Sequence, residues 1–499
     1  MNYRHITTLS LIYVLSNAAA YGMNNWFAEG NENEEARPIV WPEAMEVKTG
    51  GEILLRYENW DWFGKKNDSY DFQFQRTRAH LNINYETVAF YLEPQFVSMW
   101  NLPETAVASA PAGPSGMGAL YYIHNGDSTV HSIGLHQAWL KADKLLGEHL
   151  SVKAGRMTYN GIDYLDSRDG TKFNTLKEMR LADRLLSSFE WSAFARGFDG
   201  IRAESTLGEV ALTGSWFYPT EGGWEANFNE TIEEVRIATL GATLPKGMLH
   251  EDIEVSFFYY NYEDSRDCSQ RVDNSGTART EEAAINMHVL GGYLVGVSKA
   301  GEGQWDYLLW GAYEDGDWYE QDHSAYAFTA ETGYQWNHMT WKPWIRFGYF
   351  LGSGDSDPND ADHETFFQLA PGTRKYQLFP YYDLQNSESV YTQLILSPTE
   401  KLKIRLDYSN NRLAESTDLW YMGTGVTQED GSIFGYLGRP SGGKTQLSQD
   451  ASISISYQIS PSLQIEAFYA HVWGNDIVES IYPESSDADY CYVQTTYKF

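Results

Sequence analysis

The most constraining feature of this sequence is a two-residue alternation of apolar and polar side chains that recurs along nearly the whole chain. In the closing segment, Val493, Tyr497 and Phe499 share one face while Gln494 and Lys498 share the other. This period is that of a β-strand with one apolar and one polar side. We count about eighteen such segments, at 51–58, 76–85, 88–96, 132–141, 149–156, 198–205, 209–218, 235–244, 252–262, 286–298, 305–314, 325–336, 342–354, 391–397, 401–409, 450–459, 462–472 and 489–499.

The gaps between these segments alternate between short and long. Short gaps such as 206–208 and 398–400 are interleaved with long ones such as 159–197 and 411–449. A barrel in a bacterial outer membrane has short periplasmic turns, longer external loops and an even number of strands. A single alternating strand would also fit a soluble sandwich, but a sandwich gives no reason for alternating gaps. The sequence therefore predicts an all-β fold, a transmembrane antiparallel β-barrel of about eighteen strands with both termini periplasmic.

The amino terminus predicts export from the cytoplasm. Arg4 precedes an apolar stretch at 6–15, and the small residues at 18–20 follow it, as in a signal peptide. We expect a signal peptide at 1–20, a periplasmic N-terminal segment at 21–49 and an outer-membrane β-barrel at 50–499. No later stretch has the eighteen uninterrupted apolar residues of a membrane-spanning helix. The predicted location is the outer membrane of a Gram-negative-type bacterium.

The composition agrees with this class. Aromatic residues make up 15% of the chain, and a barrel needs them at both membrane interfaces. The formal net charge of −32 is carried largely by segments that we interpret as loops. It therefore does not determine the sign of the charge in the lumen. We expect no nucleic-acid partner. The two cysteines, Cys268 and Cys491, cannot form a disulfide framework and are interpreted as unpaired.

Two stretches resemble the alginate export family of outer-membrane porins. One contains Gly155-Arg156, then Arg184-Leu185, Trp191 and the run "RGFDGIRAES", with matching residues Arg196, Phe198, Asp199, Gly200 and Arg202. The other is the acidic "GSGDSDPNDADHETFFQLAP" followed by "QLFPYYDLQN". One departure is the stretch 164–182, which is longer than the resemblance leads us to expect.

The resemblance implies an outer-membrane channel for the export or diffusion of an anionic polysaccharide or oligosaccharide such as alginate. Two alternatives stay open: a selective uptake porin for small nutrients, and a structural or adhesive barrel whose lumen is plugged by loops. No nucleophile motif or other catalytic constellation is present, so we expect no enzyme activity. The expected partners are outer-membrane lipid, an anionic saccharide and the barrel-assembly machinery, which would recognise the terminal Phe499.

Alternation directs several basic side chains into the lumen, because a charge on the lipid face costs about 2–4 kcal/mol near the midplane. Arginine suits carboxylates, since its planar fork donates two parallel hydrogen bonds. These residues could form a row of anion-binding positions along the lumen. Alternatively, they could be neutralised by acidic residues of the lumen: Glu52, Glu58, Glu93, Glu204, Glu254 and Glu466. The candidate solute-binding residues from this alternation are Arg56, Arg76, Arg78, Lys153, Arg202, Arg346, Lys403 and Arg405, and the family resemblance adds Arg156 and Arg196.

An acidic run offers the one candidate metal site. Asp355, Asp357 and Asp360 supply hard oxygen ligands of the kind that calcium prefers, although the run lacks the spacing of an EF-hand loop. The alternative interpretation is a solvated loop. No other cofactor is expected.

Overall fold

The computed structural model describes residues 45–64, 69–165, 171–266, 273, 284–370, 372, 375–376, 378–422 and 438–499. The expected signal peptide, Cys268 and the expected N-terminal segment up to residue 44 lie outside these residues. In the part of the chain that is described, no helix has the length and apolar character needed to cross a bilayer.

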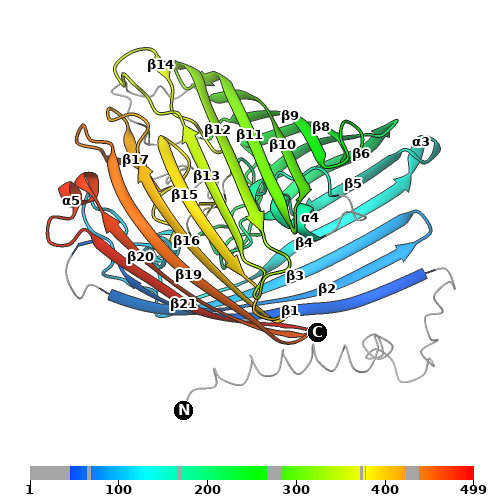
Figure 1. Cartoon of the computed structure of the whole chain (residues 1–499), viewed down its shortest axis with the longest axis horizontal. Coiled ribbons are helices and arrows are strands. Elements are labelled where there is room, and N and C mark those ends of the chain that lie inside the picture. The colour runs from blue at the N-terminus through cyan, green and yellow to red at the C-terminus, as the bar shows by residue number, and fades with distance from the viewer. Residues whose placement is uncertain are drawn as a thin grey trace, which may run out of the picture.

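Eighteen strands form one closed antiparallel barrel (Figure 1). Each strand pairs with its neighbour in sequence, and β21 returns to pair with β1, with Lys498 opposite Glu52 and Asp489 opposite Asp61. Closure leaves no unpaired strand edge in the hydrocarbon, where water cannot satisfy it. The barrel strands are β1 (Met45–Asp61), β2 (Ser69–Tyr85), β3 (Val88–Trp100), β4 (Val130–Lys144), β5 (Leu150–Met157), β6 (Phe198–Leu207), β7 (Val210–Pro219), β8 (Val235–Leu244), β9 (Ile253–Asp264), β10 (Ile285–Ala300), β11 (Gly303–Trp318), β12 (Gln321–Gln335), β13 (Trp344–Gly352), β15 (Ser387–Leu396), β16 (Leu402–Arg412), β19 (Gln446–Ser460), β20 (Leu463–Gly474) and β21 (Asp487–Lys498).

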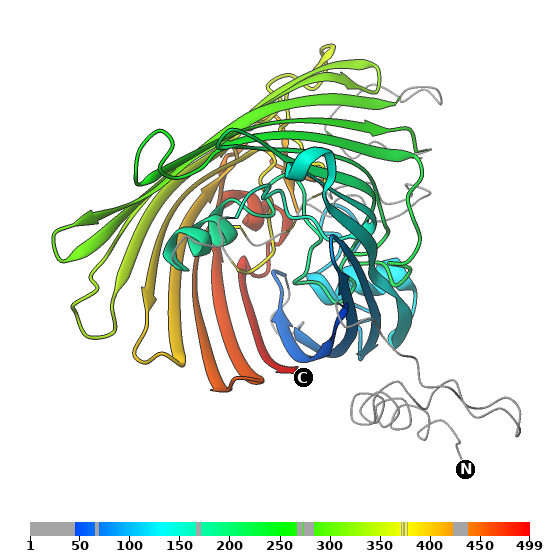
Figure 2. The same cartoon turned by 90° about the vertical axis from the view of Figure 1, so that its right-hand side faces the viewer.

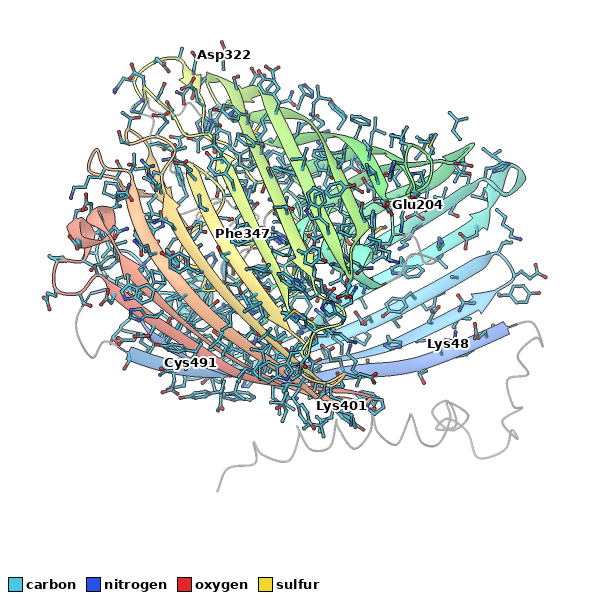
Figure 3. All side chains as sticks on the ribbon, in the orientation of Figure 1. Lys48, Glu204, Asp322, Phe347, Lys401 and Cys491 are labelled. Atoms are coloured by element: carbon cyan, nitrogen blue, oxygen red, sulfur yellow. The ribbon has the colours of Figure 1, made fainter. Side chains whose placement is uncertain are left out.

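The predicted alternation is confirmed, and it sorts the side chains between lumen and lipid. In β12, Ala325 and Ala327 are buried inside, whereas Tyr326 and Phe328 are exposed outside. Phe347 of β13 likewise lies on the outer surface, 50% exposed (Figure 3). An apolar outer band is what allows such a barrel to face lipid.

The two ends of the barrel differ. Two-residue turns at 86–87, 208–209, 301–302 and 461–462 lie at one end, and the chain closes there, where Gly51 and Phe499 exchange backbone hydrogen bonds of 2.9 and 3.1 Å. Lys401 marks this short-turn end and Asp322 the opposite end (Figure 3). At the opposite end most connections are long, but β11 and β12 are joined by a tight turn at 319–320.

The long connections fold inward, and they contain the remaining elements. These are the helices α2 (Met117–Asn125) and α4 (Thr171–Arg180) and the short strands β14 (Asp362–His363), β17 (Leu419–Tyr421) and β18 (Gly438–Pro440). Figure 2 shows segments of these connections inside the curve of the strands. Elsewhere, α3 (Leu145–Glu148) is part of a short turn, and α5 (Asp476–Ile481) joins β20 to β21.

The interior connections share a hydrophobic core with the wall. Phe366 and Leu186 of the connections pack in one cluster with Tyr260 and Trp310 of the strands. A second cluster joins Phe379 to Trp60 and Tyr490, among others. Protein therefore fills part of the lumen.

The first strand starts ahead of residue 50, where the barrel was expected to begin. β1 begins at Met45, which pairs with Tyr85, and Thr49 pairs with Leu81. Most side chains at 45–49 are exposed. The alternation does continue there, with Met45 and Val47 on one face and Glu46 and Lys48 on the other.

Candidate functional site in the barrel lumen

The lumen contains a cavity of about 870 Å³ near the short-turn end, here called the vestibule. Strands from both sides of the barrel closure line it, and α4 forms another part of its wall. Its lining residues are Glu52, Leu54, Arg56, Arg76, Lys172, Thr175, Met179, Glu190, Trp191, Gln335, Trp344, Leu378, Ile395, Ser397, Lys403, Arg405, Ser454, Ser456, Gln464, Glu466, Tyr492, Gln494, Thr496 and Lys498.

The vestibule has an excess of positive charge. Six of its lining side chains are Arg or Lys and three are Glu, although the whole chain carries a formal charge of −32. Surrounding low-dielectric walls focus the field of such groups into the opening. The net charge of the chain is thus a poor guide to the charge that a solute meets in the lumen.

Lys403 and Arg405 of β16 lie on the lumen face, as the alternation predicts. Arg405 donates a 2.7 Å hydrogen bond from Nε to Asp407 and stays partly exposed. Lys498 of β21 lines the same space. In the described part of the chain, Lys403 and Lys498 are the vestibule cations that form no ion pair, so they are available to a solute.

Arg56 and Arg76 also line the vestibule, but they hold an interior connection in place. Arg76 donates to the backbone oxygens of Glu190 and Ser192 at 2.7 and 2.9 Å. Arg56 donates to the backbone oxygen of Trp191 at 3.0 Å, and its guanidinium lies 4.6 Å from the Trp191 ring centroid. We call residues 188–193 the loop tip.

Acidic partners neutralise much of the remaining set, as the alternative interpretation of the sequence supposed. Arg78 pairs with Glu190 at 2.7 Å. Arg202 pairs with Glu204 at 2.9 Å and with Asp163 at 3.0 Å. Lys153 lies 4.6 Å from the centroid of the Trp139 ring inside the barrel.

Arg346 belongs to a buried ion network that fastens α4 to the wall. Its Nη2 donates to Glu331 at 3.0 Å and its Nε to Asp306 at 3.0 Å. Glu331 also accepts from Arg180 of α4 at 2.8 Å and from Arg184 at 3.1 Å. All of these side chains are at most 2% exposed, so Arg346 is a structural residue rather than a lumen contact.

Further ion pairs support the same helix. Lys177 of α4 pairs with Glu254 of β9, and Tyr293 donates to Glu254 at 2.9 Å. Lys172, which lines the vestibule, lies 3.6 Å from Asp306. The unusually long stretch 164–182 thus contributes a helix that narrows the lumen.

The placement of Arg156 as a lumen residue is wrong. It lies opposite Asp199 in the β5–β6 ladder, on the face of the sheet away from the buried Met157 and Phe198. Its guanidinium binds Asp199 at 2.6 and 2.7 Å and also contacts Asn229 of the β7–β8 connection. The Gly155-Arg156 motif therefore anchors that connection on the outer side.

Arg196 follows the loop tip and is fully buried. Among the described residues its guanidinium nitrogens have no hydrogen-bond partner. Its backbone N–H donates to Ser188 at 2.9 Å. Arg196 is not a lining residue of the vestibule.

The structure does not bring Asp355, Asp357 and Asp360 together as a calcium site. Among the described residues, no three His, Cys, Asp or Glu side chains are grouped closely enough to hold a metal ion. The carboxylates instead accept backbone hydrogen bonds two residues onward: Asp357 N–H donates to Asp355 at 3.1 Å, and Asp362 N–H donates to Asp360 at 2.9 Å. Such turns are a common local use of aspartate, and the run is a structured acidic loop.

Asp355 is buried beside a second acid, Asp418. The backbone N–H of Asp355 donates to Asp418 at 3.0 Å, and Thr365 and Tyr421 also donate to Asp418. Burial, together with the neighbouring Asp418, raises the pKa of Asp355 to about 7, and burial raises the pKa of Asp418 to about 6. The pair links two interior connections.

This pair predicts a dependence of stability on pH. Because the pKa of Asp355 is higher in the folded chain than its unfolded value of about 3.9, its contribution is fully present below the unfolded pKa and is lost as the pH rises through about 7. The thermal transition of the parent in detergent should therefore lie higher at pH 5 than at pH 8. Asp355→Asn should flatten this difference, whereas Asp357→Asn, a change at an exposed position of the same run, should preserve it. An equal pH dependence in the parent and Asp355→Asn would contradict the prediction.

Several residues of this site were not among the candidates from the sequence. Glu331 and Glu466 are at inward positions of alternating strands, so the alternation indicates that they face the lumen. Glu466 is also one of the acids named above as possible neutralising partners. Glu190 and Lys172 come from connections without any periodicity, and nothing local marks them as lumen residues. Lys498 is an inward residue of the closing strand, so the alternation marks it as a lumen residue too.

Comparison with known proteins adds the family and the fold. A sequence model of the family described as alginate export matches residues 125–492, and no curated protein sequence matches. The fold is similar to OpdK of Pseudomonas aeruginosa, solved with vanillate, at 11% identity, with a TM-score of 0.54 and coverage of 90% of this chain and 98% of that one. It is also similar to OccAB2 of Acinetobacter baumannii at 10% identity, TM-score 0.55 and coverage of 90% and 98%. A BenF-like porin from Pseudomonas fluorescens Pf-5 has 10% identity, TM-score 0.55 and coverage of 91% and 98%.

Proposed function

The chain belongs to the alginate export family and is an outer-membrane β-barrel channel, and from this premise we propose that it passes an anionic polysaccharide or oligosaccharide through the vestibule. The observation that carries the proposal is the excess of cations in a cavity of about 870 Å³. Lys403 and Lys498 would attract the carboxylates of such a solute. The rings of Trp191, Trp344 and Tyr492 in the same lining would offer apolar faces to its sugar rings.

The orientation of the barrel follows the general rule for its class. Short turns of outer-membrane barrels lie on the periplasmic side, so we place the vestibule there, at the entrance that an exported chain would meet. We propose that the barrel-assembly machinery recognises the C-terminal strand with Phe499, and that lipid contacts the apolar outer band. A catalytic role is no part of this proposal.

Uptake of a small carboxylate is the second candidate. The narrowing by α4 favours it, because a helix across the lumen limits the size of a solute. OpdK, which shares the fold, was solved with vanillate, and the cations of the vestibule would suit a small carboxylate as well. The two candidates differ in the length of the largest solute that passes.

Charge removal from the vestibule tests the proposed function. In planar bilayers the parent should prefer anions and be blocked by uronic-acid oligomers. The triple variant Lys403→Gln/Arg405→Gln/Lys498→Gln should bind these oligomers about tenfold more weakly, since each partly exposed pair contributes up to about 1 kcal/mol. The loss should be greatest at low salt, where screening is least.

A matched control removes three exposed lysines of the short-turn end that do not line the vestibule: Lys48, Lys299 and Lys401. Their replacement by Gln changes the total charge equally and should leave block by the oligomers near the parent value. A parent that prefers cations, or that uronic-acid oligomers do not block, would contradict the proposed solute.

A further inference from the structure

Glu190, at the loop tip, is a carboxylate of the chain itself placed among the basic residues of β2 and β4. Its Oε2 lies 2.7 Å from Nη1 of Arg78 and 4.0 Å from Nη1 of Arg76. Its Oε1 lies 3.0 Å from Nε2 of His136. Arg78 thus holds Oε2 by a hydrogen bond, as it would hold a bound organic acid, and His136 lies beside Oε1.

This position is open to the vestibule. The side chain of Glu190 is 46% exposed, whereas those of Arg76 and Arg78 are 6% and 10% exposed. Glu190 and Arg76 both line the vestibule. An anion in the vestibule can therefore reach the outer side of the Glu190 carboxylate, but it can reach Arg78, which is not a lining residue, only if that carboxylate moves aside.

The basic pair also has unused donors. Nη2 of Arg78 and Nε of Arg76 are buried and find no hydrogen-bond partner in the described part of the chain. An arginine fork donates best to a carboxylate in a planar, two-bond arrangement. Glu190 accepts a single hydrogen bond from Arg78, so a solute carboxylate approaching the fork could make more.

We infer that Glu190 is a built-in competitor that occupies a solute-carboxylate site formed by Arg76 and Arg78, and that an anionic solute passes this point by displacing it. The inference rests on the proposed function and adds a selectivity-determining residue to it. A neutral sugar has no group that can replace the Glu190 carboxylate. The exchange of one carboxylate for another would admit uronate residues while Arg78 is never left without an anion. Arg76 also has Glu52 at 3.6 Å throughout.

The backbone contacts of the loop tip allow this exchange without loss of the loop. Arg76 holds the backbone oxygens of Glu190 and Ser192, and Arg56 holds that of Trp191. These bonds do not involve the Glu190 carboxylate. The side chain can therefore rotate away while the loop tip stays in place.

The test compares Glu190→Gln with Glu466→Gln. Both changes remove one negative charge from the lining of the vestibule. The Glu466 carboxylate, however, accepts from the hydroxyls of Ser456 and Tyr492 and forms no ion pair with an arginine in the described part of the chain. Two quantities are measured in planar bilayers: block by uronic-acid oligomers, and the chloride-to-potassium permeability ratio in a salt gradient. Heat-modifiable migration checks that each variant folds.

Glu190→Gln should tighten block by the oligomers about tenfold, because a neutral amide competes poorly for a guanidinium, and it should shift permeability toward chloride more than Glu466→Gln does. Equal effects of the two variants would mean that Glu190 acts only through its charge and would overturn the inference. Weaker block in Glu190→Gln would mean that Glu190 positions the arginines, which also overturns it. If oligomers block neither the parent nor the variant while the chloride shift is specific to Glu190→Gln, the role of Glu190 as a competitor is supported and the proposed polysaccharide solute is contradicted.

Discussion

Glu331→Gln should lower the free energy of unfolding by about 3–5 kcal/mol, the cost of breaking a buried ion pair by removing one partner. The carboxylate accepts hydrogen bonds from Arg180, Arg184 and Arg346. An amide in its place would remove the negative charge that balances these buried cations. Unfolding in urea, followed by tryptophan fluorescence in detergent or lipid vesicles, measures the loss.

Glu204→Gln is the matched control for this experiment. Glu204 also pairs with an arginine, but its side chain is 45% exposed and Arg202 keeps Asp163 as a second partner. Its replacement should cost no more than about 1 kcal/mol. A Glu331→Gln variant as stable as the control would show that the interior network contributes little to the fold.

Replacing α4, Thr171–Arg180, by a Gly-Ser segment of equal length should raise single-channel conductance roughly twofold or more, since an eighteen-stranded barrel without an internal obstruction leaves an aqueous channel. Lys172, Thr175 and Met179 of this helix line the vestibule, so its loss widens the space directly. The variant should also pass longer uronic-acid oligomers than the parent does.

Lys172→Gln serves as the control, because it removes a charge from the same helix while the helix itself remains. Its conductance should stay close to that of the parent. If the helix replacement folds but conducts like the parent, the narrowest point of the channel lies elsewhere, and the small-solute alternative loses its support from α4.

Sequence periodicity was enough to predict the strands of the barrel. All eighteen predicted segments coincide with barrel strands, because each strand has one side in lipid and one in the lumen and the chain must alternate accordingly. The prediction was less accurate where a strand no longer separates lipid from lumen. The start of β1 at Met45 was missed, because Thr49 and Gly51 interrupt the apolar face between Val47 and Ile53.

The interior was harder to predict, because its contacts join residues far apart in the chain. Lys177 and Arg180 look like part of a solvated loop until Glu254 and Glu331, on distant strands, are known to face them. The same holds for Glu190, which meets Arg78 across more than a hundred residues. Arg156 was misplaced because a family motif was given more weight than its position in the alternating strand, opposite Asp199.

The fixed positive charge of the vestibule lies near one end of the barrel rather than at its middle. The vestibule at the short-turn end is basic, whereas Asp315, Asp317 and Asp322, toward the other end, lie on the outer face of β11 and β12 and therefore outside the conducting path. Charge that differs along a conducting path makes ionic current depend on the sign of the applied voltage. The channel should therefore rectify, and the direction of rectification would report which way each molecule has inserted into a bilayer.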